Sequence, residues 1–73
     1  MAQIKVKAEI TGRVWKVVAV AGTSVAEDEP IILIESMKME IPVVAPSAGV
    51  VKDILVNEGD DVAEGQDVAV LEG

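Results

Sequence analysis

A lysine set between two methionines is the clearest candidate for chemistry in this chain. The stretch IESMKMEIP places Lys38 between Met37 and Met39, with Glu35 and Glu40 just outside them. A lysine that acts as a Schiff-base nucleophile needs a desolvated or cation-flanked amine. Two nearby carboxylates favour the protonated amine instead. We therefore expect Lys38 to be a displayed amine that another enzyme modifies, rather than a catalyst.

The same stretch also allows an interpretation as an ordinary strand. Alternation along a strand would place Met37 and Met39 on one face and a solvated Lys38 on the other. Methionine also fills irregular gaps in a core. Glu35 and Glu40 are then solvated surface residues or cross-strand partners of the lysine. The residues around the lysine leave both interpretations open.

The residue types that the chain lacks exclude most catalytic chemistry. Its 73 residues include no His, Cys or Tyr, so the usual general bases and activated nucleophiles are missing. A zinc site would have to consist of carboxylates alone. The carboxylates cluster in turn-like sequence such as AEDEP and EGDD, and one small core leaves little room for a substrate pocket. We expect a protein that is not an enzyme and holds no metal.

The charge of the chain bounds its partners and location. The formal net charge of −7 argues against binding to nucleic acid or to an anionic membrane, because both need basic patches. No apolar run is long enough to span a bilayer, and MAQIKVKAEI lacks the apolar region of a signal peptide. The absence of cysteine fits a cytoplasmic protein. We expect a cytoplasmic location, with no nucleic-acid or membrane partner.

An internal repeat of 37 positions organises the chain. The segment 12–36 aligns without a gap on the segment 49–73, so that Gly12 meets Gly49. Such a repeat usually means that one supersecondary unit is used more than once, and two copies are too few for a solenoid. We expect two halves that pack face to face about a pseudo-twofold axis.

Each half predicts the same succession of short strands and turns. A strand, RVWKVVAV or VVKDILV, leads through two turns and a short extended piece at Val25 or Val62 to a closing strand, IILIE or VAVLE. QIKVKA should precede the first half as a strand, and MEIPVV should be its counterpart, with Pro42 indicating an edge or a bulge. Short strands with closely spaced turns predict an all-β barrel or sandwich of two antiparallel sheets, each mixing strands from both halves.

The glycines and the single tryptophan carry further expectations. Trp15 meets Lys52 in the repeat, and we expect it to be partly buried, with a partner contact as the alternative. Positive φ angles or tight turns are expected at Gly12, Gly22, Gly49, Gly59 and Gly65.

The repeat places the lysine at the joint between the two halves. IILIES and MEIPVV are both strand-like and nearly contiguous, so a tight hairpin is the natural connection, with Met37 and Lys38 at or near its tip. No Asn-Gly pair is present, so the turn lacks the most favourable residues. A turn held by its flanking strands is a suitable way to present one side chain.

The lysine site and the segments around it resemble a known family. ESMKMEIPV is similar to the attachment site of biotin carboxyl carrier domains, in which biotin is joined to the lysine between two methionines. GRVWKV, APSAGVV, VNEGDDVAEGQ and VAVLE resemble the framework of the same family. The resemblance covers essentially the whole chain and implies a single biotinyl domain, residues 1–73. It also implies a flattened barrel of two four-stranded antiparallel sheets, with the lysine at an exposed hairpin and both termini at the far end.

The resemblance implies a carrier function. A biotin protein ligase would attach biotin covalently to Lys38, a biotin carboxylase would carboxylate the biotin, and the arm would deliver CO2 to an acceptor at a carboxyltransferase. The acceptor is often an acyl-CoA, as in fatty acid biosynthesis, and the carrier itself catalyses neither step. Met37 and Met39 would serve ligase recognition or tune the carboxyl transfer. Glu35 and Glu40 would help the ligase to distinguish this lysine from the others.

The chain departs from the family pattern in three ways. Ser36 stands where many members have alanine, and it is small enough for attachment to survive. The gapless repeat leaves no room for the thumb loop that some bacterial acetyl-CoA carboxylase carriers have. No linker rich in proline and alanine precedes the similar region, so we expect a small stand-alone carrier or an excised domain.

Three alternatives are a related kind of carrier and two functions from other classes. A lipoyl carrier shares the fold and the displayed lysine, but it resembles Asp-Lys-Ala at the site. An unmodified interaction module would use Met-Lys-Met only as strand surface. An enzyme would turn over a substrate without any modification of the chain.

Overall fold

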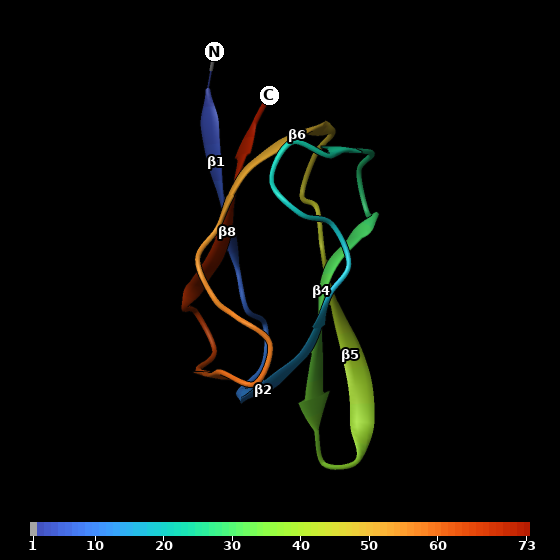
Figure 1. Cartoon of the computed structure of the whole chain (residues 1–73), viewed down its shortest axis with the longest axis vertical. Coiled ribbons are helices and arrows are strands. Elements are labelled where there is room, and N and C mark those ends of the chain that lie inside the picture. Colours follow the sequence, from blue (N-terminus) through green and yellow to red (C-terminus); the bar gives the residue numbers. More distant parts are fainter. Residues whose placement is uncertain (1) are drawn as a thin grey trace.

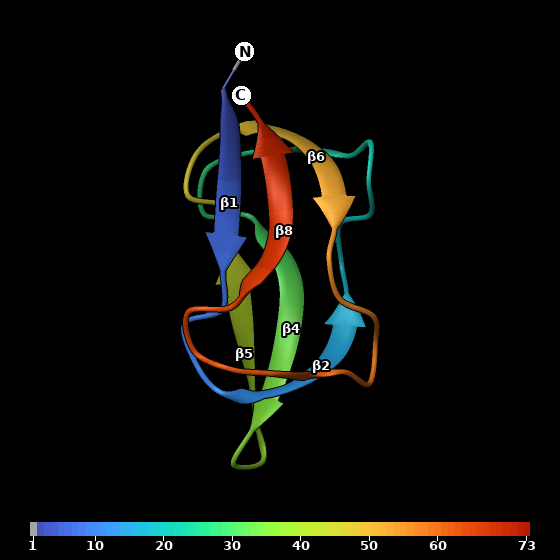
Figure 2. The ribbon, with the colours of Figure 1, turned by 90° about the vertical axis from the view of Figure 1, so that its left-hand side faces the viewer.

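Eight β-strands form two four-stranded antiparallel sheets in the computed structural model, which describes residues 2–73. Sheet A has the strand order β1-β8-β6-β3, and sheet B has the order β5-β4-β2-β7 (Figures 1 and 2). The all-β architecture predicted from the sequence is therefore confirmed. The strands are β1 (Gln3–Lys7), β2 (Gly12–Val17), β3 (Ser24–Val25), β4 (Pro30–Ser36), β5 (Met39–Val44), β6 (Gly49–Ile54), β7 (Asp61–Val62) and β8 (Asp67–Glu72).

The two sheets are related by the 37-residue repeat. When each strand is replaced by its repeat partner, the order of sheet A becomes the order of sheet B. Backbone hydrogen bonds between the halves follow the same exchange. The Gly22 N–H donates to the Val51 carbonyl at 2.7 Å, and the Gly59 N–H donates to the Val14 carbonyl at 2.8 Å. These reciprocal bonds confirm the pseudo-twofold arrangement, and each sheet contains strands from both halves.

The core lies between the sheets and consists of aliphatic side chains. Among the described residues, no polar or charged side chain is buried. Complete burial of each Val, Ile or Leu stabilises the fold by about 1.5–3 kcal/mol, so the inward-facing pattern determines the strand register. The largest fully buried side chains are Ile31, Ile32, Ile34, Leu71, Val14, Val51 and Val68.

The glycines serve two different purposes. Gly22, Gly59 and Gly65 have positive φ angles of 95°, 93° and 85°, as predicted. The prediction is wrong for Gly12 and Gly49, which open β2 and β6 without a positive φ. At these two positions a neighbouring strand comes too close for a side chain. A Cβ added at Gly12 would lie 2.5 Å from the Glu35 carbonyl oxygen, and one added at Gly49 would lie 2.8 Å from the Glu72 carbonyl oxygen.

Two further expectations concern single residues of sheet B. Pro42 lies in β5, which is an edge strand, as predicted. Trp15 in β2 is more exposed than expected, with 47% of its surface accessible to solvent. The molecule is elongated, with extents of 36 × 17 × 17 Å. The β4–β5 connection lies at one end, and both chain termini lie at the other (Figures 1 and 2).

Candidate functional site

Lys38 lies at the tip of the β4–β5 hairpin. Ser36 pairs with Met39 across the hairpin, so the loop consists of Met37 and Lys38 alone. Their φ angles are 52° and 65°. Positive φ at both central residues is the mark of a type I′ turn, whose twist matches that of the flanking strands. The predicted hairpin is present, and the interpretation of Met37 and Lys38 as alternating strand residues is wrong.

The turn is built from residues that do not favour it. The left-handed conformation costs roughly 1–2 kcal/mol for a residue other than glycine, asparagine or aspartate. At the hairpin tip both Met37 and Lys38 adopt it. The long β4–β5 ladder offsets this cost, because it pairs β5 with β4 along its whole length. The strands therefore hold a strained turn that presents the lysine.

The side chains of the turn point into solvent. Lys38 is exposed, and the exposed fractions of Met37 and Met39 are 90% and 63%. Within residues 2–73, no hydrogen bond or ion pair involves the Lys38 amine. The hairpin projects from the end of the molecule opposite the termini (Figure 2). An enzyme can therefore reach the amine without displacing any part of this chain.

The two glutamates face each other rather than the lysine. Glu35 and Glu40 are directly opposite across β4 and β5, and both are exposed. Like charges in this relation are destabilising by a few tenths of a kcal/mol or more. Arg13 of β2 lies opposite Glu35 on its other side. The interpretation of the glutamates as surface residues is confirmed, and the alternative of cross-strand partners for Lys38 is wrong.

Ser36 fastens the base of the hairpin to the neighbouring loops. Its hydroxyl donates to the Thr11 carbonyl at 3.1 Å, and the Thr11 hydroxyl accepts from the Glu64 N–H at 3.1 Å. Alanine at position 36 could not form the first of these bonds. Sequence reasoning missed this contact, because nothing in the sequence connects Thr11 with residues 25 and 53 positions away.

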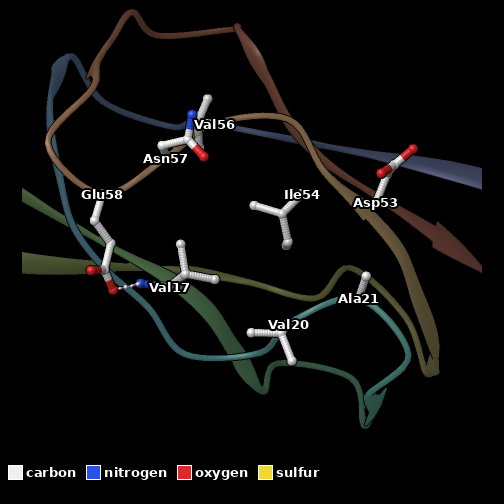
Figure 3. Close-up of a pocket in the computed structure, with 8 residues that line it drawn as sticks. All are labelled: Val17, Val20, Ala21, Asp53, Ile54, Val56, Asn57 and Glu58. Atoms are coloured by element: carbon white, nitrogen blue, oxygen red, sulfur yellow. Dashed lines mark hydrogen bonds between the residues drawn. The ribbon is translucent and has the colours of Figure 1, made fainter.

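A groove lies apart from the hairpin, among the loops that follow β2 and β6 (Figure 3). Its walls include the repeat partners Val17 and Ile54, and the Glu58 carboxylate accepts a hydrogen bond from the Val17 N–H at 3.2 Å. No residue of the hairpin tip lines it. The groove and the lysine are therefore separate features of the surface.

The described part of the chain offers neither a metal site nor a membrane-spanning helix. No three His, Cys, Asp or Glu side chains come together there as a possible metal site. The same residues form no helix that is long and apolar enough to cross a membrane.

The chain is similar to known proteins of one family along almost its whole length. A family model described as "Biotin-requiring enzyme" matches residues 2–71, so the chain belongs to the biotin/lipoyl attachment family. The biotin/lipoyl attachment protein of Bacillus subtilis (strain 168) is 43% identical over 60 residues, which cover 82% of each chain. The biotinylated protein TB7.3 homolog of Mycobacterium leprae (strain TN) is 42% identical over 66 residues, which cover 90% of this chain and 93% of that protein.

The family includes parts of much larger proteins. The urea carboxylase of Kluyveromyces lactis matches with a TM-score of 0.93 and 40% identity, over 99% of this chain but only 6% of the enzyme. A probable dihydrolipoyllysine-residue succinyltransferase component of the 2-oxoglutarate dehydrogenase complex of Schizosaccharomyces pombe is 47% identical over 51 residues. These cover 70% of this chain and 11% of that protein. The similarity thus extends both to a carboxylase and to a protein whose name refers to lipoyllysine.

Proposed function

We propose that residues 1–73 form a single biotinyl domain, a biotin carboxyl carrier that a biotin protein ligase modifies at Lys38. One observation carries this proposal. The lysine stands between two exposed methionines at the tip of a strained two-residue turn, with no partner for its amine among the described residues. An accessible primary amine is the group that an activated carboxyl acylates, so the site fits covalent biotin.

The attachment step needs only one group of this chain. The neutral Lys38 amine attacks the carbonyl carbon of biotinyl-adenylate, which the ligase supplies. An amide bond forms, AMP leaves with the bonding electron pair, and the amine loses a proton. Bound biotin supplies a ureido nitrogen that carries CO2. The domain then contributes position, because tethering keeps the reactive group at high effective concentration near successive active sites.

The partners follow from the carrier role. A biotin carboxylase would load the arm, and a carboxyltransferase would unload it onto an acceptor in the cytoplasm. We propose an acyl-CoA acceptor, as in fatty acid biosynthesis. The urea carboxylase similarity supports carboxylase chemistry with a different acceptor, so both acceptors belong in an assay of the loaded domain. The domain itself would catalyse neither half-reaction.

The neighbouring side chains have recognition roles in this proposal. Met37 and Met39 project into solvent on either side of the lysine and would contact the ligase or tune carboxyl transfer. Glu35 and Glu40 form an acidic pair just below the tip, which the other lysines of the chain do not share in sequence. This pair would help the ligase to select Lys38.

Co-expression with a biotin protein ligase, followed by intact mass and streptavidin blotting, tests the proposal. We expect a mass gain of one biotinyl group, and the change Lys38→Arg should abolish it. Lys52→Arg is the matched control, because Lys52 is exposed on a strand and should remain dispensable. An unchanged mass of the wild-type chain, or biotin on another lysine, would contradict the proposal.

A lipoyl carrier is the second candidate, and the lipoyllysine-named relative favours it. A chain that gains mass with a lipoate ligase, but gains none with a biotin ligase and does not bind streptavidin, would establish this alternative.

A further inference from the structure

The outer faces of the two sheets differ at positions that the repeat makes equivalent. The face of sheet B carries Trp15, Leu33 and Pro42, whereas the equivalent places on sheet A carry Lys52, Val70 and Lys5, two of which are charged. We call the three residues of sheet B the Trp15 patch.

The fold alone does not require a tryptophan at position 15. Strands β2 and β6 have the same burial pattern, and both contain a register shift at the same repeat position. Trp15 is the extra residue of the first bulge, and Lys52 is the extra residue of the second. Bulges re-aim side chains, and here two equivalent bulges present different ones. The fold tolerates a charged residue, Lys52, at the equivalent position of sheet A. The fold therefore does not explain why sheet B has an exposed tryptophan there.

The edge strand shows the same contrast at the position of Pro42. Leu33 lies opposite Pro42 on one side and opposite Lys16, the residue after the β2 bulge, on the other. In sheet A the partner of Val70 in the edge strand is Lys5, which stands at the repeat position of Pro42. Leu33 and Pro42 thus form an apolar pair that sheet A replaces with Val70 and Lys5, and on β2 this pair borders on Lys16 and the bulged Trp15.

The next row of sheet B, toward the hairpin, is acidic. It runs across four strands as Asp61, Arg13, Glu35 and Glu40, so that three carboxylates face one guanidinium. The Arg13 Nε and the Asp61 Oδ1 are 3.8 Å apart, and both side chains are well exposed. Such an ion pair contributes little to stability. The equivalent row of sheet A contains a single carboxylate, that of Glu72. A partner that covers the Trp15 patch and reaches Lys38 must therefore place basic side chains over this row.

We propose that the Trp15 patch is the docking surface for the biotin protein ligase, through an apolar pocket for the indole that basic side chains border. This inference rests on the function proposed above. Tryptophan is enriched among the residues that dominate binding energy, particularly where it fills a pocket surrounded by a polar rim. Leu33 is five residues from Lys38, or about 17 Å along the strand. An interface of ordinary size that encloses the lysine extends over this distance.

The experiment compares steady-state biotinylation of purified domain variants by a purified biotin protein ligase with ATP and biotin. Trp15→Lys places the residue of the equivalent bulge in sheet B. We expect it to raise the KM for the domain about tenfold or more, with kcat nearly unchanged, because Lys38 itself is not altered. Trp15→Phe should restore most of the affinity, and added salt should raise the KM of the wild type. Lys52→Ala, on the other face, should leave both constants unchanged.

The possible results are distinguishable from one another. Thermal unfolding of Trp15→Lys should match the wild type, since Lys52 occupies the equivalent site in the same fold. Equal KM values for wild type and Trp15→Lys would overturn the docking proposal while leaving biotinylation of Lys38 intact. The docking proposal would also be overturned if Trp15→Lys slowed carboxylation by biotin carboxylase without affecting biotinylation. It would likewise be overturned if the only effect of Trp15→Lys were to dissociate a dimer that the wild type forms. A wild type that accepts no biotin would overturn the proposed function itself.

Discussion

The end of the molecule that carries Lys38 and the end that carries the termini are related by the pseudo-twofold axis, but they are built differently. At the first end, β4 continues into β5 through Met37 and Lys38. At the second, β8 and β1 lie side by side in the same way, and the Gly73 N–H donates to the Ala2 carbonyl at 3.0 Å. One of two equivalent strand pairs therefore ends in a strained loop, and the other ends beside the N- and C-termini (Figure 1).

The unfavourable features gather at the hairpin end. Glu35 faces Glu40 there, whereas the equivalent pair at the other end is Glu72 and Gln3, which places no like charges together. Two residues other than glycine adopt positive φ at the hairpin end, and its methionines are largely exposed. Because the equivalent ends of β8 and β1 lack the like-charge pair and the left-handed turn, the site explains these two features better than stability does.

The largest effect is expected where a strand passes closest to the hairpin base. A Cβ at Gly12 would lie 2.5 Å from the Glu35 carbonyl oxygen, whereas a Cβ at Gly49 would lie 2.8 Å from that of Glu72. Gly12→Ala should lower the free energy of unfolding by about 3 kcal/mol, because the backbone must shift. Gly49→Ala should lower it by about half as much. Thermal unfolding checks both, and equal losses would contradict a tighter contact at the hairpin end.

Relief of the turn should act in the opposite direction. The double change Met37→Asn and Lys38→Gly installs the preferred type I′ residues, so we expect the stability to rise by about 1 kcal/mol. That corresponds to an increase in Tm of about 5 °C. Streptavidin blotting should show that attachment is lost. Lys52→Gly is the control, because glycine weakens a strand. A double variant no more stable than the wild type would show that the turn stores no strain.

A smaller effect is expected from the facing glutamates. Glu40→Gln copies the pair at the other end and should stabilise the domain by about 0.5 kcal/mol at low salt. Gln3→Glu is the matched reverse change, which creates facing glutamates next to the termini and should destabilise by a similar amount. Denaturant unfolding at two salt concentrations checks this, because salt should reduce both differences. The prediction fails unless Glu40→Gln raises the free energy of unfolding and Gln3→Glu lowers it.

The smallest effect concerns the ion pair at the bulge of β1. The hydrogen bond from Lys7, at 2.8 Å, holds the pKa of Asp67 below its ordinary value of 3.8, against an opposing effect of desolvation. A lowered folded-state pKa stabilises above the unfolded value, and the contribution is lost as the pH falls through the folded value. The equivalent pair in sheet B, Pro30 and Val44, is uncharged.

Asp67→Asn should therefore lower Tm slightly at neutral pH and flatten its dependence on pH below about 4. Lys7→Met should produce the same change, and the double variant should add nothing further. Tm measured from pH 2 to 7 tests this, and a full acid dependence retained in Asp67→Asn would assign it to other carboxylates.

The sequence by itself determined the strands, the mixing of strands from both halves in each sheet, and the hairpin with the lysine at its tip. These features follow from the alternation of polar and apolar residues along each strand and from a repeat that is visible in the sequence. Only the tertiary structure decided how Glu35 meets Glu40, how Ser36 reaches Thr11, and why Gly12 has no side chain. These contacts join residues distant in the chain, and a register between strands sets them, so they exist only once the sheets have closed over their common core.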